Sequence, residues 1–213
     1  VPGTIDNDVF GSEYTIGFDT AVNTALDAID KIRDTASSHD RVFLVEVMGR
    51  TSAEIAVRVG LSGGAESIIV PDAEEPKSKA AAKKATKKLA TKLVASLQRS
   101  AKLGKTSIIV VVAEGGKAGS TIQLGREIKA QTKIDPKVAI LGHIQRGGSP
   151  SAMDRYMASL MGADAVVAAI EGEYGIAIGI VDGRLARIPL KKVMGRHKKV
   201  DKSLLKLAEI LAS

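Results

Sequence analysis

Residues 107–116 read SIIVVVAEGG, an unbroken apolar run followed at once by a carboxylate and two glycines. Val42–Val47 (VFLVEV) has the same character, and the residues MGR follow it. Strands that are apolar at every position, rather than at every second one, are typical of a parallel sheet buried on both faces. These two segments therefore predict buried strands with glycine and polar residues beyond their carboxyl ends.

The same pattern extends along the chain in both directions. Further strands are expected at Ser67–Val70, Val138–Leu141 and Ile176–Val181. Helix-like stretches lie between the strands, at roughly Tyr14–Thr35, Ser52–Val59, Glu75–Ser100, Ser120–Thr132, Ser151–Ile170 and Ser203–Leu211. Strands that alternate with helices build βαβ units. The sequence therefore predicts an α/β fold of mostly parallel sheets with helices on both faces.

The composition is that of an ordinary folded protein. Of the 213 residues, 45% are hydrophobic and 26% are charged, and none is cysteine. Without cysteine the chain has neither disulfides nor thiolate metal sites, which fits a reducing environment. No run approaches the ~20 consecutive apolar residues of a membrane span, and the N-terminus has neither a basic start nor an apolar run. We therefore expect a cytoplasmic protein with no membrane partner.

The net charge of +7 is concentrated between Lys77 and Lys105. Leu89, Leu93 and Leu97 recur there every four residues, with lysines at the positions between them. This spacing predicts an amphipathic helix whose lysines form a solvated face. Since no aromatic residue interleaves with the lysines, the run offers no stacking platform for single-stranded nucleic acid. We expect no nucleic-acid partner.

Candidate functional residues cluster just beyond the strands, where ligands collect in open α/β sheets. Asp6 and Asp8 stand two residues apart in a short turn, so one could face a substrate hydroxyl and the other a metal ion. The alternative is a turn that hydrogen-bonds its own backbone.

Three further motifs follow strands. Met48-Gly49-Arg50 offers a guanidinium for phosphate, Glu114 could accept sugar hydroxyls, and His143 stands three residues before Arg146 in a glycine-rich turn suited to a phosphate ester. A strand terminus with a surface arginine remains the alternative for the first of them.

Together these motifs closely resemble the phosphofructokinase family, in the same order. The matching segments are PGTIDND, YTIGFDTAVNTALDAIDKIRDTASSHDR, VEVMGR, SGGAE, VAEGG and LGHIQRGGSPSAMDR. The resemblance covers the whole chain and is weakest across Asp72–Ala101 and after Arg187. It implies a phosphofructokinase-like fold of two Rossmann-like domains, the first of them incomplete. The nucleotide-binding domain would include residues 1–17 and 143–190, and the substrate and effector domain residues 18–142 and 191–213.

The activity implied by this resemblance is glycolytic. It is transfer of the ATP γ-phosphoryl group to the 1-hydroxyl of fructose 6-phosphate, with Mg²⁺, in a cytoplasmic homotetramer. In this family a glycine at the position of Gly3 goes with ATP, because a lysine there would block the α-phosphate. Two alternatives remain: a pyrophosphate-dependent enzyme, and an inactive sugar-phosphate-binding half of a split enzyme.

The resemblance also implies roles for single residues. Asp6 would be the general base, Thr4 would contact the transferring phosphoryl group, Arg50 would stabilise its charge and Asp8 would help to hold Mg²⁺. The sugar phosphate would be bound by Met48, Gly49, Glu114, His143 and Arg146, and across a subunit boundary by Arg41 and Lys137. Lys137 replaces the usual arginine, which keeps the charge and loses the bidentate geometry.

An effector site between subunits is the last feature implied. Arg33, Glu66 and Lys105 match parts of it, whereas Leu103 stands where the family has another basic residue, so the sequence leaves effector control open. Thr51 and Ser52 also depart from the family pattern. The glycine-rich ATP loop and the Gly-Gly-Asp motif of the family's N-terminal half do not occur in this sequence. We therefore expect the chain alone to be poorly stable or inactive.

Overall fold

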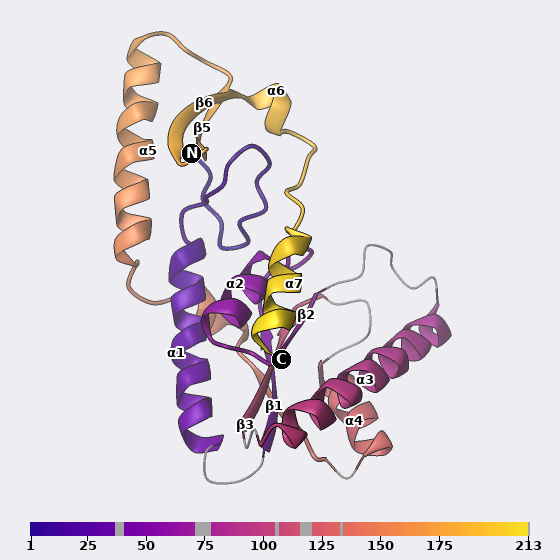
Figure 1. The fold of residues 1–213 in the computed structure, drawn as a ribbon. Helices are drawn as coiled ribbons and strands as arrows, with labels where there is room; N and C mark the ends of the chain where they lie inside the picture. The colour runs from indigo at the N-terminus through magenta and orange to yellow at the C-terminus, as the bar shows by residue number, and fades with distance from the viewer. Residues whose placement is uncertain (37–40, 71–77, 105–106, 116–120, 133, 213) are drawn as a thin grey trace.

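The computed structural model describes the whole chain except residues 37–40, 71–77, 105–106, 116–120, 133 and 213 (Figure 1). Its centre is a four-stranded parallel sheet. The strands are β1 (Arg41–Val47), β2 (Ser67–Ile69), β3 (Ser107–Ala113) and β4 (Lys137–Ile140), in the order β2-β3-β1-β4. Every pairing in this sheet is parallel, which confirms the expected strand arrangement.

Helices cover both faces of this sheet. α1 (Phe18–Ala36) and α2 (Glu54–Ser62) pack on one face, against Val45 and Val47 of β1 and the side chains of β3 that point the same way. α3 (Lys79–Lys102) and α4 (Thr121–Gln131) pack on the other, against Leu44 and the remaining β3 side chains. α7 (Lys202–Leu211) lies against α2 and β2. Within the described ranges, no helix combines the length and the apolar character that crossing a bilayer requires.

α3 has the predicted amphipathic character. Leu93 and Leu97 are buried in the sheet-facing cluster, and Leu89 packs partly against it. Seven lysines and one arginine lie on this helix, which contains no acidic residue. All eight basic side chains are exposed, as expected for a solvated face.

One expected strand does not join a parallel sheet. β5 (Ile176–Val181) pairs antiparallel with β6 (Arg184–Pro189), a strand that the sequence analysis missed. Asp182 and Gly183 form the two-residue turn between them with φ angles of 50° and 71°. Left-handed angles at both positions define the type I′ turn of a tight hairpin, for which Asp-Gly is a preferred pair. The local turn therefore decided the pairing of this strand.

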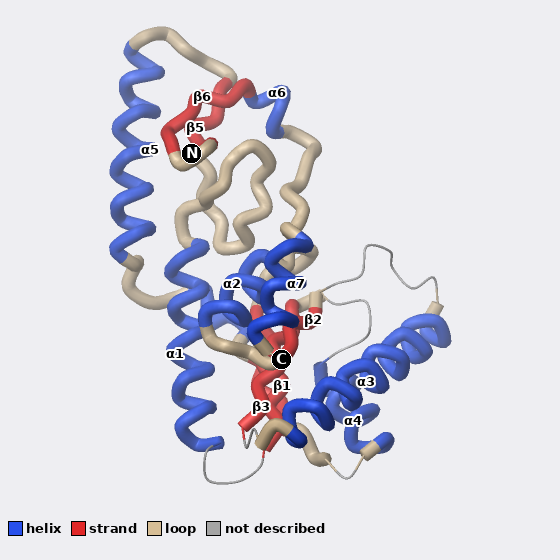
Figure 2. Tube along the Cα trace, in the orientation of Figure 1, coloured by secondary structure: helices blue, strands red, loops and turns tan. Residues whose placement is uncertain are grey.

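Two helices lie beside this hairpin. α5 (Ala152–Ile170) packs along one side of it, and the short α6 (Leu190–Val193) follows β6. The glycine-rich segment after β4 forms a 3₁₀ helix, η1 (Gly142–Arg146), which contacts α1 and β1. Figure 2 shows residues 1–17 as an irregular loop between the hairpin and the helices of the sheet.

Two helices, α1 and α3, begin four residues later than the sequence suggests. α1 begins at Phe18 rather than Tyr14, because the Asp154 carboxylate on α5 accepts hydrogen bonds from the backbone N–H of Gly17 at 2.7 Å and of Thr20 at 2.8 Å. This carboxylate caps a helix from another segment of the chain, which local sequence cannot indicate. α3 begins at Lys79, where the Ser78 hydroxyl accepts from the N–H of Ala81 at 3.1 Å.

Asp154 is buried and joins α1 to α5. Besides the two backbone bonds, its carboxylate accepts from the Tyr14 hydroxyl at 2.7 Å and from the Thr20 hydroxyl. Burial alone would raise the pKa of Asp154, but the bonds from Thr20, Gly17 and Tyr14 hold it below its ordinary value of 3.8. The pKa of Tyr14 is raised, first by burial and then by its bond to Asp154.

Replacing Asp154 is expected to loosen the packing of α1 on α5. Asp154→Ala leaves several buried donors without an acceptor and should lower the free energy of unfolding by about 3 kcal/mol. Asp30→Ala, at an exposed position of α1, should change it by less than about 0.5 kcal/mol. Urea unfolding followed by circular dichroism measures both. Equal effects of the two substitutions would contradict this role of Asp154.

The same carboxylate gives the stability a pH dependence. Because the folded-state pKa of Asp154 lies below its ordinary value of 3.8, its stabilisation is fully present above that value and is lost as the pH falls through the folded-state pKa. The difference in the free energy of unfolding between the parent chain and Asp154→Asn should therefore become smaller below about pH 4. A difference that widens with acidification would show the opposite sign of the shift.

Candidate active site

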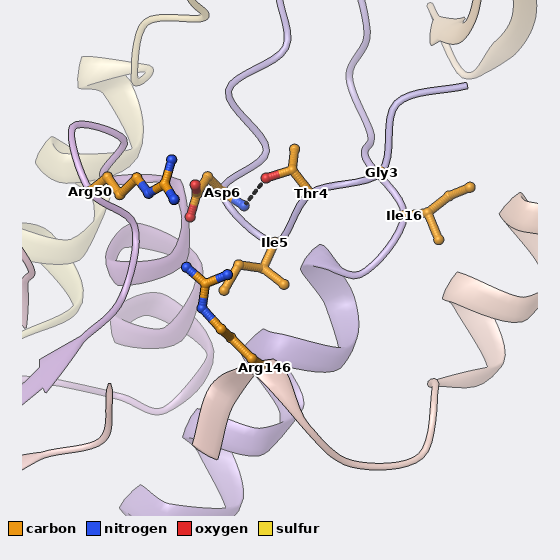
Figure 3. A pocket seen from close by; sticks show the side chains of 7 residues that line it. All are labelled: Gly3, Thr4, Ile5, Asp6, Ile16, Arg50 and Arg146. Carbon is orange, nitrogen blue, oxygen red and sulfur yellow. Dashed lines mark hydrogen bonds between the residues drawn. The ribbon is translucent and has the colours of Figure 1, made fainter. Parts of the chain in front are cut away.

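A cavity of about 340 Å³ lies where the N-terminal turn meets the loop after β1 and the helix η1. It is lined by Gly3, Thr4, Ile5, Asp6, Ile16, Arg50 and Arg146. Figure 3 shows the guanidinium groups of Arg50 and Arg146 directed from two different elements toward the carboxylate of Asp6. One anionic and two cationic groups therefore converge at this cavity.

The main chain around Asp6 is held from both sides. Its N–H donates to the Thr4 hydroxyl at 3.2 Å, and its carbonyl accepts from the Ser52 hydroxyl at 2.7 Å. Ser52 is itself buried. This bond gives a role to Ser52, one of the two positions directly after Arg50 where the sequence departs from the family pattern. Nothing in the structure explains the departure at Thr51.

The pKa of the Asp6 carboxylate is raised above its ordinary value of 3.8. Burial is the main cause, and the negative charge of Asp8 adds to it. The positive charges of Arg50 and Arg146 act in the opposite direction. A carboxylate with a raised pKa is a stronger proton acceptor than an exposed aspartate.

The loop after β1 has a backbone that only glycine fits easily. Gly49 has a φ of 147°, and a Cβ there would collide with the Ser52 carbonyl oxygen. The N–H of Ser52 donates to the Gly49 carbonyl at 2.7 Å, which closes the loop tightly. Arg50 follows with a φ of 49°, a left-handed conformation uncommon for a residue with a side chain. The tight loop places the Arg50 side chain at the cavity.

The residues that follow β3 pack against this loop. The Glu114 carboxylate accepts from the Gly49 N–H at 3.3 Å. A Cβ at Gly115 would lie 2.7 Å from the Arg50 carbonyl oxygen, so the two loops touch through their backbones. Glu114 also lies near enough for its charge to raise the pKa of Asp6.

Gln145 is a residue to which the sequence analysis gave no role. Its side chain is fully buried and accepts from the N–H of Met48 at 2.8 Å, which ties η1 to the end of β1. The only signal in the sequence was its position inside a strand-end motif. Its neighbours His143 and Arg146 are exposed and stand three residues apart on a 3₁₀ helix. Residues three apart lie on one side of such a helix, so the imidazole and the guanidinium face the same way.

Asp6 and Asp8 are the carboxylates of the N-terminal turn. The Asp8 side chain is 27% exposed and lies 3.7 Å from the imidazole of His197. In the described part of the chain, His, Asp and Glu side chains form no cluster of three that could cage a metal ion. Mg²⁺ usually binds one or two carboxylates together with water and substrate phosphates. Two carboxylates in one turn, with Asp6 lining the cavity, fit that ligand set.

Two proposed sugar-phosphate residues lie away from this cavity. Arg41 and Lys137 begin β1 and β4, at the amino ends of the strands, whereas the cavity lies beyond their carboxyl ends. Lys137 forms an exposed ion pair with Asp135 at 3.2 Å. Within one subunit these two positions cannot meet Asp6.

Two of the proposed effector residues, Arg33 and Glu66, lie in a separate region. Arg33 donates to the carbonyls of Gly63 at 2.6 Å and Gly64 at 3.2 Å, and the Glu66 carboxylate accepts from the N–H of Ile109 at 2.7 Å. Lys105 lies outside the described residues.

Comparison with known proteins gives a single answer. A family model described as Phosphofructokinase matches residues 1–169. The ATP-dependent 6-phosphofructokinase 1 of Thermus thermophilus is 52% identical over 212 residues, and the same enzyme of Halalkalibacterium halodurans is 44% identical. Both alignments cover all of this chain and 62% of the relative. The chain therefore spans about three fifths of the length of these curated relatives.

Solved structures agree in fold. Phosphofructokinase from Saccharomyces cerevisiae superposes with a TM-score of 0.75 at 30% identity, covering 98% of this chain and 26% of that one. A pyrophosphate-dependent phosphofructokinase from Marinobacter aquaeolei gives a TM-score of 0.73 at 22% identity, covering 97% of this chain and 58% of that one, a likeness of fold alone. With the family model matching most of its length, the chain belongs to the phosphofructokinase family.

Proposed function

We propose that this chain is the substrate-binding portion of an ATP-dependent 6-phosphofructokinase. The observation that carries the proposal is the convergence of Asp6, Arg50 and Arg146 at one cavity. Phosphoryl transfer needs a carboxylate that orients the attacking hydroxyl and cations that neutralise charge on the transferred group. The cavity supplies both kinds of group.

Asp6 accepts the proton of the 1-hydroxyl of fructose 6-phosphate as that oxygen attacks the γ-phosphoryl group, and the bond from that group to the leaving ADP breaks. Its raised pKa favours this role. Arg50 stabilises the charge that develops on the phosphoryl oxygens, and the Thr4 hydroxyl contacts the same group. Asp8 helps to hold Mg²⁺, which when bound neutralises the phosphates of the donor.

The sugar phosphate lies toward η1. His143 and Arg146 bind its 6-phosphate, Glu114 accepts hydrogen bonds from its hydroxyls, and Met48 and Gly49 form the adjacent wall. Arg41 and Lys137 act in the site of a neighbouring subunit. Their position at the far end of the strands supports this assignment, and it makes the functional unit a homo-oligomer, which we propose to be a tetramer.

ATP is the proposed donor, because Gly3 leaves room beside the cavity. A Cβ at this position would have no heavy atom within 4 Å, so the space is open to a nucleotide phosphate. The curated relatives, at 44–52% identity, are named for ATP, which supports the same choice. A glycolytic role in the cytoplasm follows from this reaction.

Residues 1–17 and 143–190 belong, in this proposal, to a nucleotide-binding domain completed by polypeptide that this chain does not contain, and residues 18–142 and 191–213 to the substrate and effector domain. α5 supports the first part, since large apolar side chains project from it into solvent. They are Met153, Tyr156, Val166, Val167 and Ile170. Burying such a surface is what a missing half would provide. We also propose an effector site near Arg33, Glu66 and Lys105.

The proposed reaction is tested by assaying the complete protein that contains this chain with fructose 6-phosphate and Mg²⁺. ATP should support formation of fructose 1,6-bisphosphate, and pyrophosphate should not. The 213-residue chain alone should be inactive and should bind fructose 6-phosphate. Activity with pyrophosphate only would favour the alternative donor, and no activity with either donor would favour a binding protein.

Asp6→Asn should abolish proton acceptance while leaving the cavity in place. We expect kcat to fall about a hundredfold or more, the usual range for loss of a general base, with the Kd for fructose 6-phosphate changed little. Asp30→Asn, an exposed aspartate on α1, is the control. A normal kcat for Asp6→Asn would overturn the assignment.

The two proposed phosphate-binding residues of η1 are tested by His143→Ala and Arg146→Ala. Losing a charge-assisted hydrogen bond to the 6-phosphate should raise the KM or Kd for fructose 6-phosphate about tenfold or more. Arg126→Ala, at an exposed position of α4, should leave both constants unchanged. Calorimetric titration of the sugar phosphate checks this, and unaltered binding by both η1 variants would rule out the proposed phosphate site.

A further inference from the structure

Four polar atoms form a ring beneath the turn that carries Asp6 and Asp8. The Asn7 side-chain amide donates to the Glu13 carbonyl and to the Glu54 carboxylate, each at 3.2 Å. The Lys198 ammonium lies 3.2 Å from the same carbonyl and 3.4 Å from the same carboxylate oxygen. Two donors therefore alternate with two acceptors. Asn7 and Glu13 come from the N-terminal loop, Glu54 from α2 and Lys198 from the C-terminal segment.

The charges in this ring are sheltered and balanced. The Glu54 side chain is 12% exposed and the Lys198 side chain 28% exposed. Asn7 is buried and has a left-handed φ of 48°. A sheltered carboxylate needs a partner of opposite charge, and a neutral amide alone does not supply one. Lys198 thus supplies the opposite charge beside the sheltered Glu54 carboxylate, 3.4 Å away.

The ring lies directly against the residues proposed to carry the chemistry. Asn7 stands between Asp6 and Asp8 in the sequence, so fixing its side chain fixes the direction in which both neighbours leave the turn. The N–H of Lys198 also donates to the Asp8 carbonyl at 3.0 Å. From the other side, the Ser52 hydroxyl holds the Asp6 carbonyl at 2.7 Å. All three residues of the turn are therefore anchored.

We propose that Glu54 and Lys198 are positioning residues that hold the Asp6–Asp8 turn in place against Arg50. This inference rests on the proposed phosphoryl transfer and adds two residues to it. Lys198 lies beyond the residues matched by the family model, so its role is read from these contacts. The C-terminal segment thereby takes part in the site although it does not line the cavity.

A positioning role differs from a stabilising one in what it changes. Misplacing the general base by a fraction of an ångström slows the chemical step and leaves substrate binding intact. General loosening of the fold lowers the unfolding temperature and affects binding and turnover together. The separation of kcat from the Kd for fructose 6-phosphate therefore distinguishes the two roles.

The test uses Lys198→Met in the complete protein, since methionine keeps the length of the side chain and removes its charge. We expect kcat with ATP to fall about ten- to a hundredfold, as for residues that orient a reacting group. The calorimetric Kd for fructose 6-phosphate should stay within about twofold of the parent value, because the groups proposed to bind the sugar phosphate lie outside the ring. Lys198→Arg should recover part of the rate. The matched control is Lys199→Met, the same charge change at an exposed side chain with no ion pair or hydrogen bond in the described part of the chain.

Glu54→Gln is a second, independent variant. Together with the double variant it completes a double-mutant cycle, which measures how strongly the two residues act together on kcat. If both residues act through one ring, the loss in Glu54→Gln/Lys198→Met should be smaller than the product of the single losses. A parent-like kcat in Lys198→Met, or equal losses in Lys198→Met and Lys199→Met, would overturn the inference. A parent protein unable to phosphorylate fructose 6-phosphate would instead refute the proposed function.

Discussion

β1 and β3 pair in parallel so that Val47 lies opposite Ala113, and the N–H of Glu114 donates to the Val47 carbonyl at 2.8 Å. This register brings the two strand ends to the same edge of the sheet. The loop after β1 then packs its backbone against Gly115. β4 ends beside them and leads into η1. Arg50, Glu114 and Arg146 gather at one place because three parallel strands end together.

The charges at that edge of the sheet have opposite effects on the pKa of Asp6. Burial and the neighbouring Asp8 raise the pKa of Asp6, whereas Arg50 and Arg146 lower it. Because the pKa of Asp6 is raised although two arginines lie nearby, its carboxylate is able to accept a proton while it remains close to two cations. The same two cations face a cavity open enough for a phosphoryl group. In the proposed reaction, anion binding and proton acceptance share one small volume.

The sequence was sufficient for the sheet and for most of the cavity, because both follow from local patterns. Apolar runs such as SIIVVV predicted buried parallel strands, and the residues just after them carried the polar groups. The hairpin was missed although its Asp-Gly signal was present, since its first strand was read as another parallel one. The roles of Asp154, Gln145 and Lys198 could not be predicted, because each acts on a segment far away in the sequence. Contacts of that kind depend on the finished packing and leave no periodic signal.

The basic face of α3 has a consequence of its own. Lysines four residues apart, such as Lys83 with Lys87 and Lys84 with Lys88, repel one another along the helix. Lys79 also stands at the end of the helix where the backbone dipole is positive. The leucines buried beneath the helix have to outweigh both effects. Dissolved salt screens such repulsion, with a Debye length of about 8 Å at physiological ionic strength. Added salt therefore stabilises α3, whereas it weakens a helix that is held by surface ion pairs.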